Sequence, residues 1–408
     1  MAVPGKSPEV TVTTRTPVPR LRAYDGPALL SYGFRPFFLL GSIYAGLAVL
    51  VWLPVFHGEL SLHSAFAPRD WHVHEMLYGY LPAVITGFLF TAIPNWTGHL
   101  PIQGKPLLAL VLVWVAGRII TTISADVGWL PAAAIDVGFL ALVVAAASRE
   151  ILAGKNWRNL KVVALVALLL VGNAAFHLEA HFRGMADYGV RVGIAVVALL
   201  ITVIGGRIIP SFTRNWLARE NPGRLPSPFG PLDAAIVAVS AAALATWVFV
   251  QDGPLVGMVL GLAGLLNLVR LGRWAGDRTL ADRLVLILHV GYFFVPLGFL
   301  LAAAAAFGLL LGSAGIHAWM AGAAGTMTLA VMTRASLGHT GQGLVASWPT
   351  QAIYAAVVVA ALGRICAVVE PSRSDALLHL AAGAWAAAFL GFAVVFGPAL
   401  LFRSKSAK

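Results

Sequence analysis

The sequence is short of two residue classes: it has a single cysteine, Cys366, and few charged residues of either sign. One cysteine excludes an intrachain disulfide framework and metal clusters built from cysteines alone. Charged residues make up 11% of the 408 residues, whereas an ordinary soluble domain is about a quarter charged. Residues 1–30 are polar and basic without an apolar core, so we expect a disordered tail there and no secretory signal peptide.

Long apolar runs fill most of the remaining sequence. Hydrophobic residues make up 59% of the chain, and the mean hydropathy is +0.84. The runs are long enough to cross ~30 Å of hydrocarbon as helices, and they lack the alternation of barrel strands. The sequence therefore predicts an all-α polytopic membrane protein, with about twelve spans at 34–56, 71–94, 105–124, 128–149, 160–182, 188–210, 231–250, 254–271, 283–308, 313–334, 349–369 and 376–402.

The net charge of +11 reflects topology rather than a nucleic-acid partner. Most lysines and arginines fall in the two tails and in the loops on the same side of the predicted membrane as the tails. By the positive-inside rule, both termini should lie in the cytoplasm.

Three helix ends resemble one another and are about four helices apart. They are TAIPNWT at 91–97, RIIPSFT at 207–213 and RASLGHT at 334–340. At the same distance before each end stand His74, Val190 and His317. We interpret residues 31–403 as one transmembrane domain, with three four-helix repeat units at 34–150, 160–271 and 283–402. A pseudo-threefold arrangement of such units would resemble the haem–copper oxidases.

Ionisable residues inside the predicted spans are functional candidates, because burying them in lipid is costly. With the termini inside, an outer layer gathers His72, His74, Glu75, His177, His317, Arg118 and Arg364. A second, inner layer gathers His289, Tyr292, Arg207, Arg334 and His339. Neutral imidazole suits haem iron, copper and non-haem iron. A histidine near a span end is often only an interfacial residue, and that interpretation stays open for each of them.

The depths of these residues lead to one specific model. His74 and His317, from spans 2 and 10, could hold a haem between them as axial ligands. Arg118 and Arg364 are placed to bind the haem propionates. Successive helical residues turn by ~100°, so His72 and His74 face roughly opposite ways, whereas His72 and Glu75 share a face.

Several motifs together resemble the NnrS family, over about residues 30 to 365. They are GFRPFFLL (33–40), DWHVHEM (70–76), TAIPNWTG (91–98), GGRIIPSFTRNWL (205–217), ILHVGYFF (287–294) and IHAWMAGAAGTMTLAVMTRASLGHTG (316–341). The resemblance implies a bacterial inner-membrane protein of about twelve spans that carries haem and copper. It also implies a part in denitrification and in tolerance of nitric oxide. The chain lacks the adjacent His-His pair of haem–copper oxidases, so a copper site would be built differently.

Our leading hypothesis is a membrane protein with b-type haem and copper that acts on nitric oxide, as a nitric oxide reductase-like enzyme. His72, His177 and Glu75 would then bind copper or handle protons. His289, Arg207, Arg334 and His339 would form an inner site for a second cofactor or a proton path, with Tyr292 as a further catalytic candidate. Reduction needs an electron donor, either quinol or a cytochrome.

Two alternatives remain. A secondary transporter of a small anion such as nitrite would also have twelve helices, repeats and buried arginines. A nitric oxide sensor or sink would carry haem without turnover.

Overall fold

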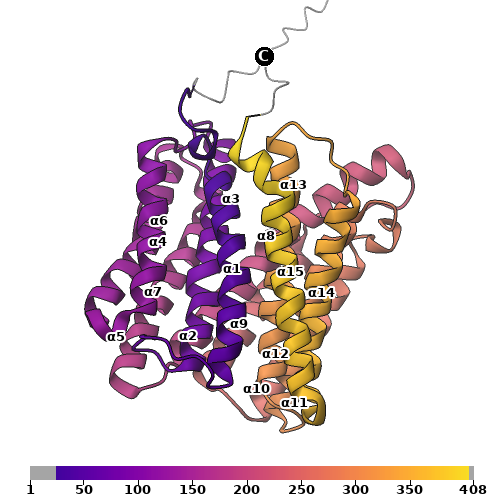
Figure 1. Cartoon of the computed structure of the whole chain (residues 1–408). Helices are drawn as coiled ribbons and strands as arrows, with labels where there is room; N and C mark the ends of the chain where they lie inside the picture. The colour runs from indigo at the N-terminus through magenta and orange to yellow at the C-terminus, as the bar shows by residue number, and fades with distance from the viewer. Residues whose placement is uncertain (1–23, 404–408) are drawn as a thin grey trace, which may run out of the picture.

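The structure is a computed structural model that describes residues 24–403, and within that range every regular element is helical. Figure 1 shows the helices as one bundle of roughly parallel and antiparallel rods. The elements are α1 (Phe34–Phe56), α2 (Pro68–His74), η2 (Glu75–Tyr80), α3 (Leu81–Thr97), α4 (Lys105–Thr122), α5 (Ser124–Val127), α6 (Trp129–Ala153), α7 (Leu160–Arg183), α8 (Tyr188–Glu220), α9 (Pro231–Phe249), α10 (Pro254–Gly272), α11 (Arg283–Ala306), α12 (Ser313–His317), η5 (Ala318–Gly325), α13 (Thr326–His339), α14 (Trp348–Val369) and α15 (Ser374–Leu401).

The predicted all-α polytopic membrane class is confirmed. Among the described residues, eleven helices are long and apolar enough to cross a membrane. The remaining predicted span, 313–334, is occupied by α12, η5 and α13, which follow one another without a break.

Proline and glycine mark several helix boundaries. Pro231 and Pro254 open α9 and α10, where a missing N–H costs nothing. Gly98 ends α3 in a left-handed conformation, with φ of 77°.

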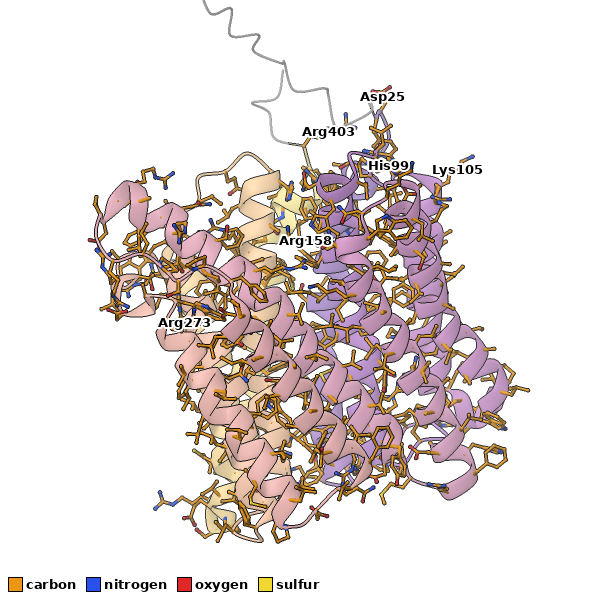
Figure 2. All side chains as sticks on the ribbon, turned by 180° about the vertical axis from the view of Figure 1, so that it is seen from behind. Asp25, His99, Lys105, Arg158, Arg273 and Arg403 are labelled. Atoms are coloured by element: carbon orange, nitrogen blue, oxygen red, sulfur yellow. The ribbon has the colours of Figure 1, made fainter. Side chains whose placement is uncertain are left out.

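The two ends of the described chain lie at the same end of the bundle. Arg35, at the start of α1, donates hydrogen bonds to the carbonyls of Ala399 and Leu400 near the end of α15, each at 3.0 Å. Helices α1 and α15 pack along each other as antiparallel neighbours. Figure 2 shows Lys105 and Arg403 at this same end. We refer to it as the terminal end, and to the other as the far end.

The helices at the bundle centre are those that carry the repeated motifs. Helix α8 packs against η2 and against η5, and α13 packs against α3. An apolar cavity of about 90 Å³ lies among α3, α8 and α13, lined by side chains such as Val84, Leu200 and Met327. The division into three repeat units stays a prediction.

Two π-helical segments interrupt the central helices at matching places. One begins at Glu75, directly after His74, and the other begins at Ala318, directly after His317. Each segment adds residues per turn and so rotates the side chains that follow relative to those before it. These are the two histidines that the repeat comparison aligned.

Most of the predicted disordered tail, 1–30, lies outside the described residues. Residues 24–30 are described and include the short helix η1 (Ala28–Leu30). The backbone N–H of Gly104 donates to the carbonyl of Leu30 at 2.9 Å, which joins this segment to the start of α4.

Candidate buried metal centre

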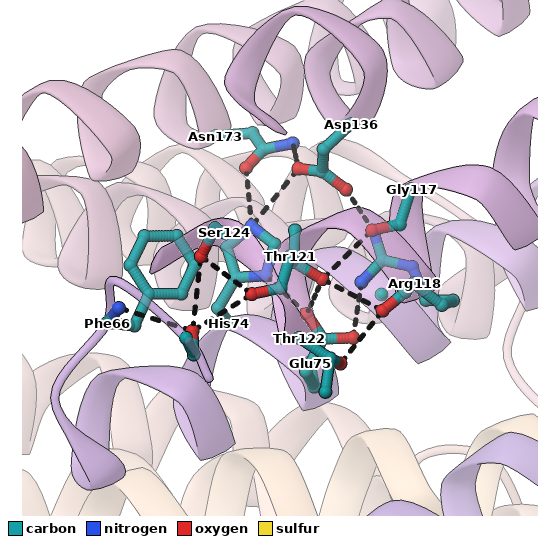
Figure 3. A network of polar contacts seen from close by, with 12 residues as sticks. Phe66, His74, Glu75, Gly117, Arg118, Thr121, Thr122, Ser124, Asp136 and Asn173 are labelled. Carbon is teal, nitrogen blue, oxygen red and sulfur yellow. Dashed lines mark hydrogen bonds and ion pairs between the residues drawn. The ribbon is translucent and has the colours of Figure 1, made fainter. Parts of the chain in front are cut away.

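A buried polar cluster lies between four helices, toward the far end of the bundle. Figure 3 shows five of its members: His74 and Glu75 at the junction of α2 and η2, Arg118 from α4, Asp136 from α6, and Asn173 from α7. The sixth is His177, also from α7. All six side chains are buried. Buried ionisable groups are costly unless they are paired, so their partners decide what the cluster can do.

His74 lies between two carboxylates. Its Nδ1 is 2.8 Å from Glu75 Oε1, and its Nε2 is 3.1 Å from Asp136 Oδ2. The same Nε2 is also 3.1 Å from Asn173 Oδ1. Both ring nitrogens therefore face oxygen atoms that can accept a hydrogen bond.

Arg118 joins the same two carboxylates from the opposite side. Its Nη1 donates to Glu75 Oε2 at 2.6 Å, and its Nη2 donates to Asp136 Oδ1. Thr121, one turn on along α4, donates from its hydroxyl to Glu75 Oε1 at 3.0 Å. The hydroxyl of Tyr44 donates to Glu75 as well. Neither carboxylate is left without a cationic partner.

Glycine makes room for the arginine. A methyl group built on Gly79 would lie 2.3 Å from Arg118 Nη1 and 3.0 Å from Glu75 Oε2. A methyl group on Gly117 would lie 3.3 Å from Asp136 Oδ1. The guanidinium thus occupies space that any larger residue at position 79 would fill.

His177 completes a set of possible metal ligands. Its Nε2 lies 3.0 Å from Asp136 Oδ2, and its ring centroid is 5.0 Å from that of His74. One ligand atom from each of His74, Asp136 and His177 lies within 4.8 Å of the others. Two imidazoles and a carboxylate form a donor set that suits non-haem iron, copper or zinc.

The charge of the cluster is consistent with a bound cation. Two carboxylates face one guanidinium, so ionised Glu75 and Asp136 exceed the charge of Arg118 by one unit. A proton shared with His74, or a metal ion bound to His74, Asp136 and His177, would supply the missing positive charge. The residues present therefore fit a metal ion.

His74 and His317 have different partners, and His72 is the histidine with which His317 interacts. His72 stacks on Trp52, with ring centroids 4.1 Å apart, and its buried Nδ1 has no hydrogen-bond partner within the described chain. His317 interacts electrostatically with both His72 and Arg364. Its Nδ1 donates to the carbonyl of Ser313 at 2.6 Å, which leaves Nε2 free to bind a metal.

Two further predictions about these residues need correction. His72 and Glu75 do not share a site, because Glu75 turns to Arg118 and His74 while His72 turns to Trp52. Arg118 is not free for a propionate, because two carboxylates already hold it. Helical spacing gave the wrong answer for the first pair because the helix changes to a π-helix at Glu75.

The residues of the expected inner layer are dispersed over separate contacts. His289 Nε2 lies 2.9 Å from the Thr213 hydroxyl, and its buried Nδ1 has no hydrogen-bond partner in the described part of the chain. Tyr292 donates to Asn267 Oδ1 at 2.8 Å and accepts from Arg270 Nη1 at 3.1 Å. The other three have different neighbours. Arg207 Nη1 donates to Asn159 Oδ1 at 2.9 Å. The guanidinium carbon of Arg334 lies 4.0 Å from the centroid of the Phe212 ring, and the rings of His339 and Tyr32 stack with centroids 5.5 Å apart. A single inner cofactor site built from all of them is not seen.

Sequence reasoning missed the two residues that tie the cluster together, Asp136 and Asn173. Asp136 is an isolated carboxylate inside the apolar run 128–149, and intramembrane carboxylates are as costly as arginines. The same signal was available for Arg270, which is fully buried and forms an ion pair with Asp233 at 3.1 Å. Asn173 gives no comparable signal, since an uncharged amide is tolerated in many spans.

The fold and this cluster define a polytopic helical membrane protein with a buried set of potential metal ligands. A family model described as NnrS protein matches residues 28–403, nearly the whole chain. The protein belongs to the NnrS family. Membership links it to nitric oxide metabolism and to a family associated with metal and haem binding. The search for similar curated proteins found no match.

Proposed function

We propose that the protein is a haem- and copper-containing membrane protein that removes nitric oxide by reduction or another detoxifying reaction, in nitrosative stress or denitrification. The observation that carries the proposal is the buried His74, Asp136 and His177 set, tied by Asp136 to the guanidinium of Arg118. Family membership supports the link to nitric oxide.

In this proposal the two groups of histidines hold different cofactors. His74, Asp136 and His177 hold copper or non-haem iron, because their donor atoms fit such an ion. His72 and His317, with Arg364 beside them, hold a b-type haem. Among residues 24–403, Nδ1 of His72 has no hydrogen-bond partner and Nε2 of His317 is not used by its bond to Ser313, so both fit that role. When bound, these metals supply the redox chemistry and the site at which nitric oxide binds.

The residues of the chain then have defined tasks. Arg118 keeps Glu75 and Asp136 in place and offsets one of their two negative charges. Asn173 fixes the orientation of Asp136 by donating to its Oδ2 at 2.8 Å. Glu75 touches His74 and the Tyr44 hydroxyl, so it can pass a proton between them. The apolar cavity among α3, α8 and α13 has room for several water-sized molecules and suits a small apolar gas.

A reductive reaction also requires electrons and protons from outside the chain. Quinol in the bilayer or a cytochrome would supply the electrons. Nitric oxide is small and apolar enough to reach a buried site through lipid.

The test is metal analysis with a reduced-minus-oxidised visible spectrum of the full chain, purified from haem-replete cells. We expect a haem band that changes in His72→Ala and in His317→Ala. We expect non-haem metal to fall in His177→Ala. His181→Ala is the matched control, because His181 lies one turn on in α7 and stacks on Trp129 at the surface.

Each other outcome is informative. A colourless, metal-free wild type would overturn the proposal and favour a carrier of a small anion. A haem band without nitric oxide consumption in the presence of reductant would favour a sensor or sink. A haem band that is unchanged in both variants would move the haem ligands to other histidines.

A further inference from the structure

A second cluster of potential metal ligands lies on the surface at the far end of the bundle. His57 follows the last residue of α1, while Asp375 and His379 are in the first turns of α15. The antiparallel packing of α1 and α15 brings these positions together, although they are distant in sequence. The cluster shares no residue with the buried centre.

The three side chains already lie close to the spacing that a metal ion needs. His57 Nε2 is 3.4 Å from Asp375 Oδ1, and His379 Nδ1 is 3.7 Å from the same oxygen. Two ligands about 2.1 Å from one tetrahedral ion are about 3.4 Å apart. One ligand atom from each residue lies within 4.8 Å of the others, so a small side-chain adjustment would close the set.

The rings of the two histidines lie against each other. The imidazoles of His57 and His379 stack with centroids 5.2 Å apart and 25° between their planes. His379 Nδ1 donates to the backbone carbonyl of Asp375 at 2.9 Å. A metal ion at the spacing given above would bind Nδ1 of His379 in place of this hydrogen bond.

All three residues are open to solvent. The exposed side-chain fractions are 28% for His57, 72% for Asp375 and 53% for His379. An ion from solution can therefore reach the cluster without passing through the bundle, and water molecules can complete its coordination.

We propose that His57, Asp375 and His379 form a surface site for a divalent transition-metal ion such as Zn²⁺ or Cu²⁺. Two imidazoles with one carboxylate are borderline ligands that these ions prefer over Mg²⁺ or Ca²⁺. Binding would clamp the end of α1 to the start of α15, opposite the place where Arg35 joins the same two helices.

The test is histidine modification by diethyl pyrocarbonate, read residue by residue by mass spectrometry on the full chain in detergent, with and without Zn²⁺. We expect Zn²⁺ to slow modification of His57 and His379 at least tenfold. His63 is the internal control, because it forms an exposed pair with Asp126 at 3.1 Å, and no third potential metal ligand is grouped with that pair among the described residues. Its modification rate should stay unchanged.

Variants provide a second measurement. Asp375→Asn should raise the Zn²⁺ concentration needed for half-protection by at least about tenfold, because loss of a ligand should cost no less than loss of an outer-shell partner. Asp126→Asn is the matched control and should have no effect. Equal modification of His57 with and without about 1 mM Zn²⁺ would overturn the proposal, because a site that stays empty at this concentration has a dissociation constant above about 1 mM. Protection of His63 to the same extent as His57 would overturn it as well.

Discussion

Arg118 and Asp136 form a buried ion pair that connects α4 to α6 within the apolar part of the bundle. The exposed fractions of the two side chains are 6% and 1%. Because Arg118 also binds Glu75 at 2.6 Å, one guanidinium pairs with carboxylates from two helices. The stability of the whole cluster therefore depends on this arginine.

Arg118→Leu should strongly destabilise the protein. The change leaves Glu75 and Asp136 buried without their cation, and the loss of one partner of a buried pair costs about 3–5 kcal/mol. The effect is measured by heating the protein in detergent and quantifying the fraction that stays folded by size-exclusion chromatography. Arg183→Leu is the control, because Arg183 is 68% exposed. The double variant Arg118→Leu/Asp136→Asn should recover part of the loss. Unchanged unfolding of Arg118→Leu would mean that the ion pair is not formed.

Gly79→Ala should destabilise the protein as Arg118→Leu does, but without removing a charge. The added methyl group would overlap with the guanidinium, since the Cβ would lie 2.3 Å from Arg118 Nη1. We expect a lower unfolding temperature and a lower metal content. Gly138→Ala, on the neighbouring helix α6, meets no atom within 4 Å and should behave as wild type. Wild-type stability of Gly79→Ala would show that Arg118 lies elsewhere.

Tyr292→Phe separates a structural from a catalytic role of this tyrosine. The change removes the hydrogen bond that Tyr292 donates to Asn267 and the one that it accepts from Arg270. We expect a loss of stability of about 1–3 kcal/mol, as for other buried polar groups that lose a partner. If Tyr292 is structural, nitric oxide consumption per folded molecule should not change. A large loss of turnover with normal stability would support the catalytic role that the sequence suggested.

The distribution of lysine and arginine predicts that both termini are cytoplasmic. A fluorescent protein fused to the C-terminus should therefore fold and fluoresce, whereas alkaline phosphatase at the same position should be inactive. Phosphatase fused after His57, at the far end of α1, should be active. The reverse pattern would invert the topology and place the exposed His57 cluster in the cytoplasm.

The sequence predicted the helices well because apolar length is a local property. The first span was expected at 34–56, and α1 runs from Phe34 to Phe56. The second was expected at 71–94, while the observed helical segment runs from Pro68 to Thr97. Its polar start, which includes Asp70, is buried in the bundle, so hydropathy alone placed the boundary too late.

Contacts between helices were harder to predict, because they depend on which face each helix turns inward. The sequence placed His74 and His177 at a common depth, and the structure brings both to Asp136. It also suggested that His74 faces His317, whereas His72 is the histidine on that side. A π-helical segment changes the facing of the residues that follow it, and no simple spacing rule reveals one.

The pair between Arg118 and Asp136 also bears on how the chain enters the membrane. Each residue alone opposes insertion of its helix by about 2.5–3.5 kcal/mol at the centre of a span, and by less nearer the end. The two residues stand on consecutive membrane-spanning helices, joined only by a short connection that contains α5. If α4 and α6 leave the translocon together as a hairpin, the ion pair can form before either charge meets lipid. The order of the helices along the chain thus lets a buried charge be neutralised during synthesis, before the helices that follow α6 have been made.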